Sequence, residues 1–313
     1  MTNNYALISA VIPTLRRPEL VTRAVQSVMA QTHPHMEILV IVDGPDLLTV
    51  EKLTSLDCAW LRIISLPESV GGSEARNIGV REASGEWIAF LDDDDIWLPQ
   101  KAERQLAAAQ SFQGTDVVIS SRFIARSDEQ DQICPARVPA LNQRIDEYIC
   151  CPEGWGIGEG FLQTSTFFVR KDLMLRIPFV YGLKRGQDFA WMIQVCNKGN
   201  AVVHVVPEVL SIFTAQTQAE VQRISRHPQW RSLHDWIRSN RIYFTPKTYS
   251  FCLTQILLPD VLQCKESLSV RVSLLKECII DGKPTLKCLI IFILKAFFPL
   301  KIVRWIRSVA FAH

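Results

Sequence analysis

The sequence predicts an α/β fold with a doubly wound, mixed but mainly parallel sheet, followed by a C-terminal helical extension. Two observations predict the sheet: short apolar runs alternate with segments of helical periodicity, and the connections between them are short. Strands joined by single helices run parallel in one sheet. Of the 313 residues, 48% are hydrophobic and 21% are charged. This composition supplies an ample core and excludes a disordered chain.

The first third of the chain predicts four strands and three helices. The first strand is expected over 6–12, where Pro13 ends an apolar run, and Pro18 suits the first turn of a helix that extends to Ala30. The remaining elements follow in strict alternation. Strands are expected at 36–44, 60–66 and 86–91, and helices at 47–56 and from Ser73 to about Ala83.

The second part of the chain is less regular. A helix is expected at 99–110, a strand at 116–120, and an irregular excursion over 122–160. Three further elements follow, which are a strand at 165–170, a helix at 187–198 and a strand at 201–206. Because the composition changes after residue 240, we expect two parts. Residues 1–240 would form an α/β domain that holds the functional site, and residues 241–313 would form a helical segment.

Three notable sequences lie at the carboxyl ends of predicted strands. They are Pro13-Thr14, Asp43-Gly44 and the run Asp92-Asp93-Asp94-Asp95. Ligands bind at the carboxyl ends of strands in open parallel sheets. Four adjacent carboxylates repel one another, and their oxygens suit a hard cation such as Mg²⁺ or Mn²⁺. The alternative is a solvated acidic loop, but this run lies between the apolar sequences EWIAFL and IWLP.

Three stretches together resemble the family 2 glycosyltransferases. They are VIPTLRRPELVTRAVQSVMAQ, EILVIVDG and GGSEARNIGVREASGEWIAFLDDDDIWLPQK, in order and with the usual spacings over about the first 105 residues. The resemblance implies the GT-A fold and an inverting, metal-dependent transfer from a nucleotide-sugar. It also implies that the Asp-x-Asp motif of the family lies at Asp92-Asp93-Asp94.

The resemblance assigns donor-site roles. Asp94 would bind the divalent ion, Mn²⁺ or Mg²⁺, that bridges the nucleotide diphosphate. Asp92 would contact the ribose or assist the metal, Asp93 would lie at the donor nucleotide, and Asp95 would be structural. A cation is needed there because negative charge grows on the leaving diphosphate.

Four more donor-side positions match the family pattern. Asp43 would hydrogen-bond the nucleotide base, typically uracil, and it is also suited to capping the turn before Gly44. Pro13 and Thr14 would line the nucleotide site. Arg76 would lie near the nucleotide, and its alternative is a helix-surface arginine.

The second landmark of the family is an acidic pair that begins a helix, and Gln187-Asp188 lies at that place. Asp188 would be the general base that takes the proton of the acceptor hydroxyl. The sequence departs from the family at Gln187, which replaces the usual Glu. Alternatively, Asp188 is an N-cap or first-turn acid. Trp191, one turn later, and Trp155 in GWGIGEG are acceptor-side candidates.

Downstream, the family often carries a Tyr-Arg…His…Ser loop. Here Thr214 and Gln216 occupy the expected Arg and His positions, so we expect no metal or phosphate ligand from that loop. His204 is expected to be a structural histidine, and His33 and His35 are expected to be loop residues.

The C-terminal segment carries a separate signal. Residues 241–313 sum to +7, so the first 240 sum to −5 within a total of +2. If the residues after Pro299 form a helix, Ile302, Trp305 and Ile306 fall on one apolar side of it, and Arg304 falls on a separate basic side. A basic amphipathic helix suits an anionic membrane surface. The alternative is packing on the catalytic domain or on a second subunit.

We therefore expect a glycosyltransferase at the inner face of the cell membrane, with a lipid-linked or surface-glycan acceptor. Rival hypotheses are a sugar-nucleotide nucleotidyltransferase, which would need a glycine-rich loop after the first strand, and a non-catalytic nucleotide-binding scaffold. The near-neutral charge argues against a nucleic-acid partner. A cytoplasmic location is expected because no signal peptide is evident and nine cysteines at irregular spacings suit reduced thiols.

Overall fold

The computed structural model describes residues 5–127, 130–140, 143–151, 159–214 and 230–298. The chain divides into two compact units, residues 1–145 with 154–223, and residues 146–153 with 224–313. The main part of the second unit thus begins at residue 224, and the separate segment 146–153 also belongs to it. The sequence places the boundary at residue 240 instead.

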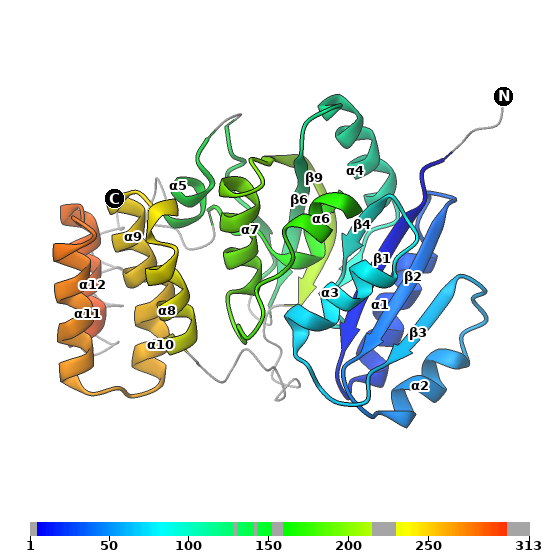
Figure 1. Cartoon of the computed structure of the whole chain (residues 1–313), viewed down its shortest axis with the longest axis horizontal. Helices are drawn as coiled ribbons and strands as arrows, with labels where there is room; N and C mark the ends of the chain where they lie inside the picture. Colours follow the sequence, from blue (N-terminus) through cyan, green and yellow to red (C-terminus); the bar gives the residue numbers. More distant parts are fainter. Residues whose placement is uncertain (1–4, 128–129, 141–142, 152–158, 215–229, 299–313) are drawn as a thin grey trace. The chain divides into compact units, whose positions relative to one another are not determined.

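The first half of the first unit alternates strands and helices along the chain (Figure 1). The elements are β1 (Ile8–Thr14), α1 (Pro18–Met29), β2 (Met36–Val42), α2 (Leu47–Thr54), β3 (Leu61–Ser65), α3 (Gly72–Glu82), β4 (Trp87–Phe90), β5 (Ile96–Trp97) and α4 (Lys101–Ala109), which continues into η1 (Gln110–Phe112). The predicted β-α-β-α-β-α-β order is confirmed.

The second half of the first unit completes the sheet. Its elements are β6 (Val117–Arg126), β7 (Gln132–Cys134), η2 (Thr164–Thr166), β8 (Phe168–Arg170), α6 (Lys171–Arg176), α7 (Gln187–Asn197) and β9 (Val202–Thr214). The region expected to be an irregular excursion holds the end of β6 and the short strand β7.

The strands form one mixed sheet in the order β3-β2-β1-β4-β8-β6-β9-β5, with β7 paired to β6. The strands β1 to β4 are parallel, β6 pairs parallel with β9, and β8 is antiparallel to both β4 and β6. This arrangement confirms the predicted mixed, mainly parallel sheet. The parallel half gathers the carboxyl ends of β1, β2 and β4 at one edge.

Helices cover both faces of this sheet. Along β1, Ile8, Ala10 and Ile12 belong to one buried cluster with the inner face of α1. On the opposite face, α3 approaches so closely that a Cβ at Gly79 would lie 2.4 Å from Val11 Cγ1. The absence of a side chain at this position lets the helix lie against the strand.

Pro13 does not end the first strand as expected, because β1 continues to Thr14. The pairing of β1 with β4 ends at Val11, where the Leu91 amide donates to the Val11 carbonyl at 3.1 Å. Along a strand, the backbone groups of successive residues point alternately toward one neighbouring strand and then the other. Pro13 lies two residues after Val11, so its nitrogen points toward the side of β4, where the pairing has already ended. Its missing N–H therefore breaks no ladder hydrogen bond.

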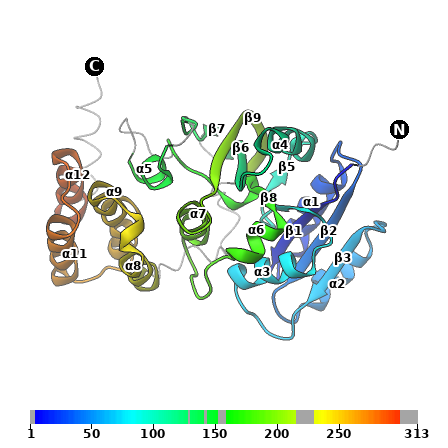
Figure 2. The same cartoon turned by 45° about the horizontal axis from the view of Figure 1, so that its top comes forward.

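The second unit is helical in its described part (Figure 2). It comprises α5 (Ile145–Cys150) apart from its first residue, α8 (Trp230–Ser239), η4 (Arg241–Tyr243), α9 (Pro246–Phe251), the π-helical turn η5 (Cys252–Leu257), α10 (Leu258–Gln263), α11 (Leu268–Ile280) and α12 (Leu286–Phe297). Buried side chains of α9, η5, α10, α11 and α12 form its core. In the described part of the chain, none of the helices has both the length and the apolar character needed to span a bilayer.

Candidate active site

The last residue of β1 contacts the residues that follow β4 at the carboxyl edge of the parallel strands. Thr14, the last residue of β1, is 3% exposed and its Oγ1 donates to Asp93 Oδ2 at 2.8 Å. The two residues are 79 positions apart in sequence. Parallel alignment of β1 with β4 brings them together, and the predicted donor-site residue Thr14 therefore directly supports the aspartate loop.

Asp43, which follows β2, is 4% exposed and organises the loop before α3. Its Oδ2 accepts from Ser69 Oγ at 2.9 Å and from the Gly71 amide at 3.0 Å, and its Oδ1 accepts from the Val70 amide at 2.6 Å. An ionised carboxylate has about four acceptor positions. Three are used by the loop, so Asp43 shapes the walls of the site and keeps limited capacity for a ligand.

An arginine after β1 neutralises part of the aspartate run. Arg17 Nη1 lies 3.0 Å from Asp93 Oδ1 and 3.4 Å from Asp94 Oδ2. Burial nevertheless raises the pKa of Asp93 to about 6, with the charges of Asp94 and Asp92 adding to the rise and Arg17 opposing it. The buried Asp93 carboxylate therefore binds a proton more readily than an ordinary aspartate, even beside Arg17.

Asp95 is structural, as the resemblance implies. It is 1% exposed, and it accepts from Ser165 Oγ at 2.5 Å and from the Thr214 amide at 3.2 Å. Burial raises the pKa of Asp95 well above its ordinary value, and the neighbouring carboxylates add to the rise. Ser165 Oγ also accepts from the Asp92 amide at 3.0 Å, and Thr214 Oγ1 donates to the Asp94 carbonyl at 2.9 Å. The loop is thus held from η2 and from the end of β9.

Arg76 of α3 links the aspartate loop to α7. Its Nη1 donates to Gln187 Oε1 at 2.8 Å, and its Nη2 forms an ion pair with Asp92 Oδ1. Gln187 in turn donates through Nε2 to the Leu183 carbonyl at 2.6 Å. Arg76 is 8% exposed, and its Nε has no hydrogen-bond partner among the described residues. The arginine is therefore a buried bridge across the site and not a helix-surface residue.

Asp188 lies in the first turn of α7, after Gly186 in a left-handed conformation with φ 69°. Its Oδ1 accepts from the Phe189 amide at 2.8 Å, which is the local contact expected of a first-turn acid. Burial raises the pKa of Asp188, the charge of Asp92 adds to the rise, and Arg76 opposes it. The carboxylate therefore has a higher proton affinity than an ordinary aspartate, which favours a base.

The donor set of the aspartate loop fits a divalent cation. Asp92 keeps 28% of its side chain exposed and Asp94 keeps 12%. Mg²⁺ is commonly held by one or two carboxylates together with substrate phosphates. Such a site does not require three protein ligands, and no group of three or more His, Cys, Asp or Glu side chains suited to a metal occurs in the described ranges.

The two tryptophans predicted on the acceptor side have different outcomes. Trp191 is fully buried, its Nε1 donates to the Ile177 carbonyl at 2.8 Å, and its ring packs against Phe167 and Phe179. A ring enclosed in this way has no face open to a sugar, so the prediction for Trp191 is corrected to a core role. Trp155 lies outside the described residues.

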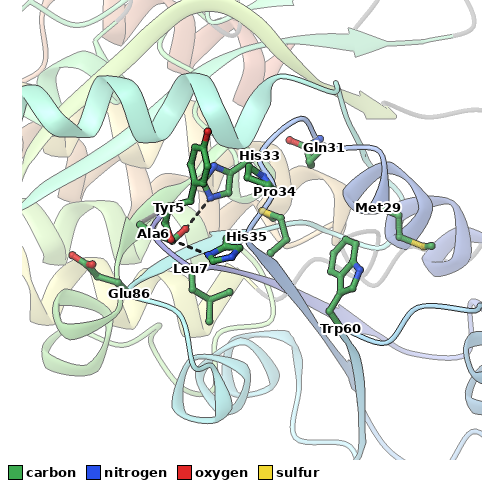
Figure 3. A pocket seen from close by; sticks show the side chains of 11 residues that line it. Tyr5, Ala6, Leu7, Met29, Gln31, His33, Pro34, His35, Trp60 and Glu86 are labelled. Carbon is green, nitrogen blue, oxygen red and sulfur yellow. Dashed lines mark hydrogen bonds between the residues drawn. The ribbon is translucent and has the colours of Figure 1, made fainter. Parts of the chain in front are cut away.

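The predicted loop and strand histidines lie away from the aspartates. His33 and His35 line a depression of about 820 Å³ beside residues that precede β1 and β4, at the opposite edge of the sheet (Figure 3). His33 Nε2 and His35 Nδ1 bond to the carbonyls of Ala6 and Tyr5 at 2.8 and 3.0 Å. His204 packs on Phe112 with ring centroids 5.2 Å apart, as expected of a structural residue.

Sequence reasoning missed Arg17 and Ser165 as parts of the site, and it did not foresee that Thr214 supports the aspartate loop. Arg17 had a signal, because a cation immediately after the first strand suits an acidic loop at the same edge. Ser165 had none, since it lies 70 residues from Asp95 and 73 from Asp92. Pro13 stays within β1, one residue before Thr14.

The chain is similar to known glycosyltransferases. Residues 9–157 match the profile of glycosyl transferase family 2. The putative teichuronic acid biosynthesis glycosyltransferase TuaG of Bacillus subtilis is 35% identical over 111 residues, which are 34% of this chain and 43% of that protein. The amylovoran biosynthesis glycosyltransferase AmsE of Erwinia amylovora is 28% identical over 240 residues, which are 75% of this chain and 84% of that protein.

A third relative, from Escherichia coli, is named UDP-Glc:alpha-D-GlcNAc-diphosphoundecaprenol beta-1,3-glucosyltransferase WfgD. It is 32% identical over 101 residues, which are 32% of this chain and 40% of that protein. The chain thus matches less than half the length of TuaG and of WfgD.

Solved structures agree on the fold. Residues 1–349 of TarS from S. aureus, in complex with UDP-GlcNAc, align with TM-score 0.54 and 18% identity, covering 95% of this chain and 82% of that chain. The mannosyltransferase PcManGT of Pyrobaculum calidifontis, in complex with GDP-Man and Mn²⁺, aligns with TM-score 0.58 and 16% identity, covering 87% and 76%. At these identities the likeness extends to the fold alone.

Proposed function

We propose that the chain transfers a sugar from a nucleotide-diphosphate donor, a UDP-sugar, to an acceptor hydroxyl, because residues 9–157 match the family 2 glycosyltransferase profile. The reaction is inverting and depends on Mn²⁺ or Mg²⁺. The observation that carries the proposal is the bridge of Arg76 between Asp92 and Gln187. It brings the aspartate loop, α3 and the start of α7 to one edge of the sheet.

The donor binds across the carboxyl ends of β1, β2 and β4. The base lies near Asp43 and the loop 69–71, and the ribose lies near Asp92. The diphosphate lies toward Asp92 and Asp94, which would hold a divalent cation. When bound, that cation neutralises the charge that develops on the leaving diphosphate. Arg76 adds a second positive charge on the same side.

Asp188 takes the proton from the acceptor hydroxyl as the oxygen attacks the anomeric carbon. Its raised pKa suits this role, because a base must hold the proton once the bond has formed. One displacement inverts the anomeric configuration and needs no covalent sugar intermediate. The neutral side chain of Gln187 positions Arg76 and leaves proton transfer to its neighbour.

The acceptor that we propose is a lipid-linked or surface glycan, and the place of action is the cytoplasmic surface of the membrane. The named relatives TuaG, WfgD and AmsE support a glycan acceptor by analogy. The basic, apolar sequence after Pro299 supports contact with anionic lipids.

The test is a transfer assay over a panel of nucleotide-sugars with and without Mn²⁺. We expect turnover of a UDP-sugar that chelation abolishes, and a loss of at least a hundredfold in kcat for Asp94→Ala and Asp188→Asn. The matched control for Asp188→Asn is Asp172→Asn, because Asp172 is also a first-turn acid, of α6. Unchanged turnover in Asp188→Asn, or an equal loss in both variants, refutes the role of the base. UDP binding by calorimetry without turnover of any donor would favour the scaffold instead.

A further inference from the structure

The helix α12 has one apolar face that is buried and a second apolar face that is partly exposed. Its inner face is buried in the second unit through Cys288, Phe292 and Ala296. The opposite face carries four large apolar side chains, which we call the apolar stripe. The stripe consists of Leu286, Ile290, Ile293 and Phe297, which are 74%, 43%, 37% and 37% exposed.

The spacing of the stripe makes it one continuous line. Positions i, i+4, i+7 and i+11 fall within about 60° of one another around a helix with 100° per residue. The line therefore runs along the whole of α12, about 18 Å at 1.5 Å per residue. Scattered exposed apolar residues are ordinary on protein surfaces, but a full helix face of them marks an interaction surface.

The charged residues within α12 itself are both lysines, Lys287 and Lys295. Lys287 lies about a quarter of a turn from the stripe, and Lys283 precedes the helix and is exposed. Lys295, the third cation, donates to Gln255 Oε1 at 2.7 Å. From Gly282 to His313 the sequence contains no Asp or Glu, and it adds Lys301, Arg304 and Arg307 after α12. A partner for this face must accept apolar side chains and be negatively charged at its rim.

The need for an apolar and negatively charged partner decides between a second copy of the chain and a lipid surface. A second copy docked on the stripe by a two-fold axis would bring together two identical helices that carry lysines and no acids. Anionic lipid headgroups complement it, while the acyl boundary beneath them accepts leucine, isoleucine and phenylalanine. We propose that α12 lies in the plane of an anionic bilayer, with the apolar stripe inserted below the headgroups. The inference rests on the proposed function, because a transferase for lipid-linked acceptors works at that surface.

The experiment measures co-sedimentation of the full chain with vesicles. The probes are equimolar phosphatidylglycerol and phosphatidylcholine, and phosphatidylcholine alone. The test variant is Ile290→Asp with Ile293→Asp. The matched control is Ile133→Asp with Leu175→Asp, which replaces two side chains of the first unit that are 56% and 52% exposed and makes the same change in net charge.

We expect the wild type and the control to bind the anionic vesicles equally, and the test variant to partition at least tenfold more weakly. Binding of the wild type should fall in 0.5 M salt and be weakest on phosphatidylcholine, as the lysines require. Circular dichroism should be alike in all three proteins at the temperature of the binding assay, since none of the four replaced side chains is buried.

Several results would overturn the proposal. They are absence of wild-type binding, equal binding by the test variant, or an equal loss in the control. Light scattering that shows a lipid-free dimer, converted to monomer by the test variant, would instead make the stripe a self-association surface. Turnover of a nucleotide-sugar with a soluble acceptor should persist in the test variant. That readout separates the bilayer proposal from the transferase proposal, because either can fail without the other.

Discussion

Replacing Ser165 by alanine should destabilise the first unit and misplace the aspartate loop. The serine is fully buried, its Oγ donates to Asp95 at 2.5 Å, and the same oxygen accepts from the Asp92 amide at 3.0 Å. The change leaves two polar groups without that partner, and each buried group that loses a hydrogen bond costs about 1–3 kcal/mol. We expect a loss of about 3 kcal/mol in the free energy of unfolding.

The matched control for this change is Ser211→Ala. Ser211 is also fully buried in the sheet, but its Oγ has no hydrogen-bond partner within the described part of the chain. Replacement by alanine removes an unsatisfied hydroxyl, so the free energy of unfolding should change by less than about 0.5 kcal/mol or rise.

Urea unfolding followed by tryptophan fluorescence measures both variants, and the transfer assay measures kcat/KM. We expect Ser165→Ala to lose stability and also at least tenfold in kcat/KM at temperatures where it is folded, because the Asp92 amide loses its anchor. If Ser165→Ala unfolds within 0.5 kcal/mol of Ser211→Ala, the serine does not hold the loop and the reasoning is wrong.

Three further predictions follow from the same contacts. Asp93→Asn should remove a pH dependence. The folded pKa of about 6 exceeds the ordinary value of 3.8, so the metal-free wild type should lose about 3 kcal/mol of unfolding free energy relative to the variant between pH 3 and pH 7. A stability difference that stays constant over this range in urea titrations would contradict this. Gln187→Met keeps the size of the side chain but removes the acceptor of Arg76. The KM for the donor should therefore rise about tenfold. A KM equal to that of the wild type would show that Gln187 does not position the arginine. Gly79→Ala forces a Cβ to within 2.4 Å of Val11 Cγ1. The free energy of unfolding measured with urea should fall by about 1–3 kcal/mol. A fall of less than about 0.5 kcal/mol would mean that α3 moves freely away from the strand.

The order of the elements was predictable because it depends on local patterns. The runs at 36–44 and 86–91 are apolar and short, and the structure places β2 and β4 within them. The position of the aspartates at the carboxyl edge followed from the parallel order alone. The extension of β1 past Pro13 was not predictable, because it depends on where the partner strand stops pairing.

Side-chain roles were predictable only in part. Tryptophan in the first turns of a helix near an acid suits either a binding surface or a core, and periodicity does not say which face meets the sheet. The helix α7 turns Trp191 inward against Phe167 and Phe179. Arg76 likewise suits either a surface or a site until α7 is placed beside α3.

The sequence by itself determined the alternation of strands and helices, the acidic run after β4 and the excess of cations after residue 240, since each is written in neighbouring residues. Only the tertiary structure decided that Ser165 holds Asp95, that Gln187 holds Arg76 across 111 positions, and that α12 leaves a second apolar face partly exposed. Such contacts depend on which elements meet in space, and one chain without its fold does not encode that choice in any local pattern.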